Sequence, residues 1–220
     1  MNIAFAAKEI ENAIVALPSM DTQSLRGVRK AFSQQLVSES GRDVFDLSKR
    51  LISNPRVSNF IAYELIAHHT AAFAALTAMD LDLLTADLNN WWTVDAFACY
   101  LAGVAWREGG IKDALIHSWA GSDSVWVRRA ALASTIPLNN KTRGGNGDAT
   151  RTLAVCDLLI HDREDMIVKA MSWALRELSK RDPGAVVDYL ERNHDKLAAR
   201  VLREVSTKLT TGLKNPPKNL

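Results

Sequence analysis

Apolar residues along the chain recur at the spacing of helices. They return every three or four positions, as in Leu153, Cys156 and Ile160, which places them on one helix face. We find no convincing alternation of apolar and polar residues of the kind that predicts a half-buried strand. Eleven Gly and six Pro are few for 220 residues, whereas folds of many short strands need many turn residues. The pattern therefore predicts an all-α protein.

Short polar marks divide the apolar runs into segments one or two helices long. Each mark contains a residue that caps, ends or begins a helix. The marks are Asp21-Thr22, Ser53-Asn54-Pro55, Asp80, Gly109-Gly110, Ser122-Asp123, Asp162 and Asp182-Pro183. Residues 139–148, rich in Asn and Gly, predict instead a mobile loop whose Lys141 and Arg143 would reach a phosphate.

Two segments resemble each other at an offset of 40 residues. Residues 123–130 and 163–170 both predict a helix start and carry an apolar residue followed three positions later by a cation. Trp91, 35 residues before Trp126, opens another such helix. Because repeats of about 40 residues with two helices each form HEAT-like solenoids, we expect a HEAT-like helical-repeat solenoid with a concave binding face. It would form a single domain over residues 1–212, followed by a flexible tail over residues 213–220.

The charge is uneven along a chain of ordinary globular composition, 47% hydrophobic and 24% charged. The net charge is +2, but residues 1–110 hold 9 basic and 12 acidic residues, and residues 111–220 hold 18 and 13. The two halves thus carry −3 and +5. The basic second half is compatible with a surface that binds a polyanion.

The sequence indicates neither a cleaved leader nor a membrane span. Charged residues interrupt the apolar start at Ile3–Ala7, and Glu64 interrupts the most apolar window, Ile61–Met79. The two cysteines, Cys99 and Cys156, lie in apolar stretches and are expected to pack as small hydrophobes in a reducing compartment. We expect a cytoplasmic protein that does not bind a membrane.

Three of the six tryptophans lie beside charges at helical spacing. Trp91 and Asp95, four residues apart, would place a flat apolar ring and a carboxylate on one helix face. Trp126 lies near Arg129. Trp173 belongs to a stripe spaced i, i+4, i+7 and i+11 that otherwise holds cations, namely Lys169, Arg176 and Lys180. Trp92 and Trp106 are expected to be packing residues, and Trp119 and Trp126 to lie between helices.

No metal or other cofactor is expected. Glu64 and His68 have the i, i+4 spacing of a ligand pair, but without a third ligand a solvated or core helix face is the better interpretation. Motifs of nucleotide-binding loops, hydrolase triads and structural zinc sites are absent from the sequence.

Three ordered motifs resemble the HEAT-repeat DNA alkylation repair glycosylases, the AlkD-like family. Asn90-Trp91-x-x-Val94-Asp95 is similar to the helix that carries the family's catalytic tryptophan and aspartate. Residues 124–132 resemble the family's W-x-R-R-x-A-I helix, whose arginine holds DNA, and residues 162–180 resemble its K-A-I-G-W-x-L-R-E-x-S-K helix. With Arg200-x-x-Arg203-Glu204, the resemblance covers about residues 88–208.

This resemblance implies a monofunctional DNA glycosylase that excises cationic alkylated purines, such as 3-methyladenine and 7-methylguanine, from duplex DNA and leaves an abasic site. It implies that the catalytic residues are Asp95, Trp91 and Trp173, and that the DNA-binding residues are Arg129, Arg128, Lys169, Arg176, Lys180, Arg200 and Arg203. It also implies a monomer that binds double-stranded DNA carrying alkylated bases. For Arg129 the alternative is a structural ion pair with Asp123 or Asp95.

These residue types suit the reaction, because an alkylated cationic base already leaves readily. The carboxylate of Asp95 would stabilise the oxocarbenium-like sugar and position water. The indole faces of Trp91 and Trp173 would attract the sugar more strongly as it becomes cationic. The alternative is a non-catalytic HEAT-like protein that binds nucleic acid or serves as a scaffold.

Overall fold

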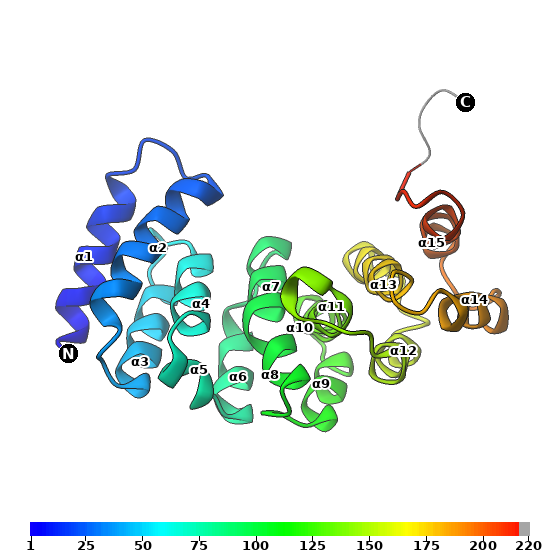
Figure 1. Cartoon of the computed structure of the whole chain (residues 1–220), viewed down its shortest axis with the longest axis horizontal. Helices are drawn as coiled ribbons and strands as arrows, with labels where there is room; N and C mark the ends of the chain where they lie inside the picture. Colours follow the sequence, from blue (N-terminus) through cyan, green and yellow to red (C-terminus); the bar gives the residue numbers. More distant parts are fainter. Residues whose placement is uncertain (216–220) are drawn as a thin grey trace. The chain divides into compact units, whose positions relative to one another are not determined.

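The computed structural model of the chain describes residues 1–215, which form α-helices joined by short turns, with no β-strand among them (Figure 1). The all-α prediction is confirmed, and the fold is one of helical repeats. The chain divides into two compact units, Met1–Leu101 and Ala102–Leu220. A single domain over residues 1–212 and a concave binding face stay predictions. Of the tail expected at 213–220, residues 213–215 are exposed and 216–220 lie outside the described residues.

The first unit is organised around α3 and α4. Helix α3 contacts α1, α4 and α5, whereas α2 and α7 both pack against α4. The helices are α1 (Ile3–Val15), α2 (Thr22–Leu36), α3 (Gly41–Ile52), α4 (Asn59–Ala67), α5 (Thr70–Ala74), α6 (Ala78–Leu84) and α7 (Trp91–Phe97), with a 3-10 turn η1 (Thr85–Asp87). Their apolar faces are almost completely buried, as at Ile10, Leu47 and Ile61.

Polar side chains cap the start of several of these helices. They accept hydrogen bonds from backbone N–H groups that have no partner within the helix. Asp21 accepts the Ser24 N–H and so begins α2 at the predicted position. Asp80, predicted to mark a boundary, lies instead within the first turn of α6, where it forms a capping box with Thr77. The boundary is therefore at Thr77, three residues earlier than the acidic residue indicated.

The second unit shows the repeat in its packing. Helix α9 contacts α12, while α10 contacts α13 and α13 contacts α15, so each helix packs on its counterpart in the next pair. The helices are α8 (Gly103–Arg107), α9 (Asp113–Ala120), α10 (Val125–Ala133), α11 (Ile136–Asn139), α12 (Ala149–Leu158), α13 (Asp165–Leu178), α14 (Pro183–Arg192) and α15 (Ala199–Thr211). Helices α10 and α13 begin 40 residues apart, which confirms the offset seen in the sequence.

Residues 139–148, predicted to be a mobile loop, are tied to the rest of the second unit. Asn139 belongs to α11, and residues Lys141–Arg143 form the 3-10 turn η3. Arg181 donates to the carbonyls of Asn139 and Gly145 over 2.9 and 3.2 Å, and Arg107 donates to the carbonyl of Arg143. The loop composition was recognised correctly, and its backbone is bound by Arg107 of α8 and by Arg181 of the turn between α13 and α14.

Most of the side chains expected to pack are buried. Trp106 and Trp119 are buried, whereas Trp126 is half-buried. Cys99 and Cys156 are buried, as predicted. No helix within residues 1–215 combines the length and apolar character that crossing a membrane requires.

Two glycines of the first unit predict opposite responses to alanine. A Cβ on Gly41 would lie 2.5 Å from the Ala71 carbonyl oxygen, because the start of α3 presses against α5. A Cβ on Gly27, within α2, would meet nothing within 4 Å. We expect Gly41→Ala to lower the free energy of unfolding by about 1–3 kcal/mol, and Gly27→Ala to raise it by about 0.5–1 kcal/mol. Urea unfolding of both variants checks this, and equal stabilities would contradict the close packing of α3 on α5.

Candidate nucleic-acid interface

Two adjacent indoles are exposed where α7 begins. The side chain of Asn90 caps this helix by accepting the Thr93 N–H at 3.0 Å. Trp91 and Trp92 are 52% and 38% exposed, and their rings meet edge to face at 5.9 Å between centroids. Trp92 packs on Phe60 at 5.7 Å, as expected of a packing residue, yet more than a third of it remains exposed. We call Trp91 and Trp92 the indole pair; aromatic surface exposed in this way is typical of a binding site.

Asp95 lies one helical turn after Trp91 on α7 and is half-buried. The spacing read from the sequence is therefore realised, with the exposed ring and the carboxylate on one helix face. Helix α7 continues directly into the π-helical turn η2 (Ala98–Ala102). Turns of this kind occur frequently at functional sites.

The predicted catalytic residue of the second unit, Trp173, is half-buried on α13. The cations of its stripe, of which Lys180 lies just beyond the end of α13, all have partners on this helix. The N–O distances are 2.6 Å for Lys169–Asp165, 3.2 Å for Arg176–Ser172 and 2.6 Å for Lys180–Glu177. These contacts hold the cations in place along the helix.

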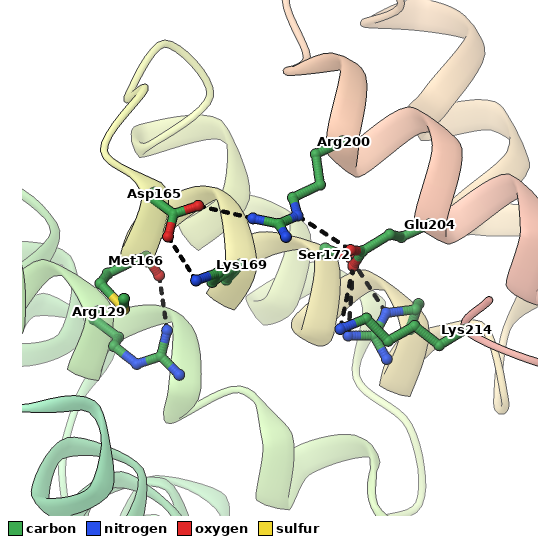
Figure 2. A network of polar contacts seen from close by, with 9 residues as sticks. Arg129, Asp165, Met166, Lys169, Ser172, Arg200, Glu204 and Lys214 are labelled. Carbon is green, nitrogen blue, oxygen red and sulfur yellow. Dashed lines mark hydrogen bonds and ion pairs between the residues drawn. The ribbon is translucent and has the colours of Figure 1, made fainter.

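A buried carboxylate gathers further cations between α13 and α15 (Figure 2). Glu204, 5% exposed, accepts from the Ser172 hydroxyl at 2.7 Å and from Arg200 Nε at 3.1 Å. It also pairs with Arg176 at 4.0 Å and with Lys214 at 3.8 Å. Burial opposes the ionisation of Glu204, but the Ser172 hydroxyl and the three cations outweigh it and hold the pKa of this carboxyl below its usual value.

Arg200 connects Glu204 to a second acidic residue. Its Nη1 lies 2.7 Å from Asp165, which also pairs with Lys169 (Figure 2). Lys169 and, to a smaller extent, Arg200 lower the pKa of Asp165. We call this network the Glu204 cluster: the acids Asp165 and Glu204 with the cations Lys169, Arg176, Arg200 and Lys214. Four cations face two carboxylates, so the cluster has an excess of positive charge.

The remaining predicted DNA-binding residues differ in exposure. Arg203 is exposed on α15 and makes no ion pair with a described residue. Arg128 donates to the Asp162 carboxylate at 2.8 Å and to the carbonyls of Ser122 and Asp123 at 2.9 Å each. These bonds tie α10 to the turn that precedes it and to the segment between α12 and α13.

Arg129 is more deeply placed than Arg128. It is 6% exposed, and its Nη1 donates to the Met166 carbonyl at 2.8 Å (Figure 2). Its contact with α13 gives it a structural role, and its predicted contact with phosphate stays a prediction.

Comparisons with known proteins decide the family. The sequence profile of a family described as DNA alkylation repair enzyme matches residues 17–209. The chain belongs to this family. A solved structure titled "Predicted DNA alkylation repair enzyme from Enterococcus faecalis" superimposes with a TM-score of 0.71, over 94% of this chain and 96% of that one. At 16% identity this likeness shows the fold. No curated protein matches the chain.

All ten predicted site residues lie within the part of the chain that matches the DNA alkylation repair enzymes. The match begins at residue 17 and so includes α2, where our sequence reasoning identified no functional residue. There, Arg26 and Arg29 pair with Glu64 of α4, which is 1% exposed. The signal in the sequence was a single acidic residue inside an otherwise apolar helix, and its partners lie more than 30 residues away.

The Glu204 cluster predicts a dependence of stability on pH. A carboxyl whose pKa is lowered by folding adds stability above its unfolded pKa and loses that contribution as pH falls through its folded pKa. We expect Glu204→Gln to lower the free energy of unfolding by about 1–2 kcal/mol at neutral pH. The difference from wild type should shrink as pH falls below the ordinary value of 4.5.

Urea unfolding at a series of pH values measures this difference. Glu191→Gln, which removes an exposed carboxylate without a described partner, is the matched control and should show no such change. A difference between wild type and Glu204→Gln that stays constant with pH would contradict the assignment of the cations to Glu204.

Proposed function

We propose that this DNA alkylation repair enzyme is a monofunctional glycosylase. Its substrates would be cationic alkylated purines such as 3-methyladenine and 7-methylguanine in duplex DNA, and its product an abasic site. The observation that carries the proposal is the exposed ring of Trp91 one turn from the carboxylate of Asp95. A flat π face next to a carboxylate is suited to a flat, cationic sugar.

In the proposed reaction the bond between C1′ of the sugar and the ring nitrogen of the base breaks first, and its electron pair leaves with the base. Because the base is already cationic, it departs neutral and needs no strong general acid. Asp95 stabilises the cation that develops on the sugar, orients a water molecule toward C1′ and accepts a proton from it. Trp91 and Trp173 contact the sugar through their π faces, which bind the cationic transition state better than the neutral sugar.

The duplex backbone would be bound by cations that α10, α13 and α15 present. The excess charge of the Glu204 cluster and the exposed side chains of Arg203 and Lys180 support this proposal. For Arg128 and Arg129 we propose the phosphate contacts that the family resemblance implies. We propose that the protein acts as a monomer in the cytoplasm, associated with the nucleoid when bound to DNA, and requires no cofactor.

A second candidate is a HEAT-like protein that binds nucleic acid or acts as a scaffold without base excision. The hydrogen bonds of Arg128 and Arg129 to the protein itself favour it, because they leave fewer donors for DNA. This candidate predicts salt-dependent binding of DNA without release of a base.

An assay of wild type and Asp95→Asn on methylated duplex DNA distinguishes the two candidate functions. Released bases are detected by chromatography, and no metal or cofactor is added. We expect wild type to release 3-methyladenine or 7-methylguanine, and Asp95→Asn to lower the rate at least about 100-fold with DNA affinity unchanged. Asp87→Asn, which removes an exposed carboxylate in η1, is the matched control and should keep full activity.

Equal activity of wild type and Asp95→Asn would remove Asp95 from the mechanism. Wild-type protein that binds methylated DNA but releases no base would favour the non-catalytic candidate.

A further inference from the structure

The first unit contains a buried ion cluster that the proposed reaction does not use. Glu64 is the one charged residue of α4, and it is almost completely buried. Arg26 and Arg29 of α2 donate to its two carboxylate oxygens over 2.9 and 3.2 Å. A buried carboxylate needs such partners because its loss of hydration is costly. Two guanidinium groups against one carboxylate leave a positive charge in excess.

The two arginines differ in what they present to solvent. The side chain of Arg29 is 10% exposed, whereas that of Arg26 is 40% exposed. Arg26 is nevertheless fixed on three sides: Nε on Glu64, Nη2 on the Tyr100 hydroxyl at 2.7 Å, and the guanidinium carbon 5.3 Å from the centre of the Phe60 ring. Its Nη1 makes no hydrogen bond to a described residue. The result is a guanidinium of fixed orientation with donors still directed to solvent.

The neighbours of Arg26 complete a surface suited to nucleic acid. The ring of Phe60 contacts both Arg26 and Trp92, so the guanidinium and one indole of the pair pack against the same ring. Lys30, one turn further along α2, is exposed. Burial and the nearby cations, Arg29 first among them, hold the pKa of His68 below its usual value, which agrees with a positive local field.

We propose that Arg26 binds a backbone phosphate of duplex DNA beside the indole pair, and that Glu64 and Tyr100 are positioning residues that orient its guanidinium. A fixed guanidinium suits a phosphate because it offers paired N–H donors at little entropic cost. The proposal places a contact with DNA in residues 1–110, the half of the chain with net negative charge. It rests on the proposed function only in requiring DNA binding, and not base excision.

The test measures affinity for a fluorescent, undamaged duplex by anisotropy at several salt concentrations. Each phosphate contact contributes about 0.9 to the slope of log K against log salt concentration. We expect Arg26→Gln to lower the steepness of this slope by about 0.9 and to weaken binding about tenfold at low salt. The matched control is Arg50→Gln, which removes one exposed charge from the end of α3 in the same unit and should change neither quantity.

Tyr100→Phe tests positioning separately from charge. It removes the hydroxyl that holds Nη2 and leaves the guanidinium charge, so we expect severalfold weaker binding at every salt concentration with an unchanged slope. Arg26→Lys should behave in the same way, and it remains informative if loss of the charge beside Glu64 prevents folding of Arg26→Gln. Thermal unfolding of each variant establishes that it is folded before binding is measured.

The outcomes distinguish this inference from the proposed function. If Arg26→Gln and Arg50→Gln change the slope equally, or if Arg26→Lys and Tyr100→Phe bind like wild type, the inference is overturned. If DNA binding depends on Arg26 but methylated bases are not released, the glycosylase proposal fails and the phosphate contact stands. Wild-type protein that does not bind duplex DNA overturns both.

Discussion

A carboxylate withdrawn from water must be surrounded by cations, and this requirement shapes the polar structure of both units. Glu64 and Glu204 are each almost completely buried on a helix, and each is met by arginines from that helix or from a neighbouring one. The hydrophobic packing of the helices brings these groups together, and the ion pairs then determine where each guanidinium lies. Around each of these two buried carboxylates, the cations outnumber the acids. Stabilising the fold and presenting positive charge are thus achieved by the same contacts.

This arrangement has a consequence for binding a polyanion. A flexible lysine or arginine loses side-chain entropy when it binds phosphate, whereas a side chain already held by a buried carboxylate has lost that freedom on folding. Arg26 illustrates this state in the first unit and Arg200 in the second. The interactions that hold these arginines are internal, so the same donors cannot all be offered to DNA.

The sequence predicted what depends on neighbouring residues and missed what depends on distant ones. The start of α2 follows from its local cap, Asp21, and the starts of α10 and α13 follow from the 40-residue offset. The spacing of Trp91 and Asp95 is likewise fixed once a helix forms. By contrast, Arg26 and Glu64 are 38 positions apart, and only the packing of α2 on α4 brings them together.

The same distinction applies to the errors. Residues 139–148 have the composition of a loop, but the hydrogen bonds that Arg107 and Arg181 donate to their backbone could not be predicted from any local pattern. The partial exposure of Trp92 depends on how far Phe60 covers it, which is again a matter of tertiary packing. The partners of Lys169 and Lys180 could have been predicted from the sequence, because each lysine has an acidic residue of α13 three or four positions before it.

The burial of both cysteines has a meaning particular to a protein of alkylation repair. Electrophiles that alkylate DNA also attack sulfur, and the thiolate is the form that reacts. Cys156 is completely buried in the second unit, and burial raises the pKa of its thiol, so the side chain is kept both protonated and out of reach. Cys99 is buried in the first unit. The enzyme therefore exposes no cysteine sulfur to the reagents whose damage it repairs.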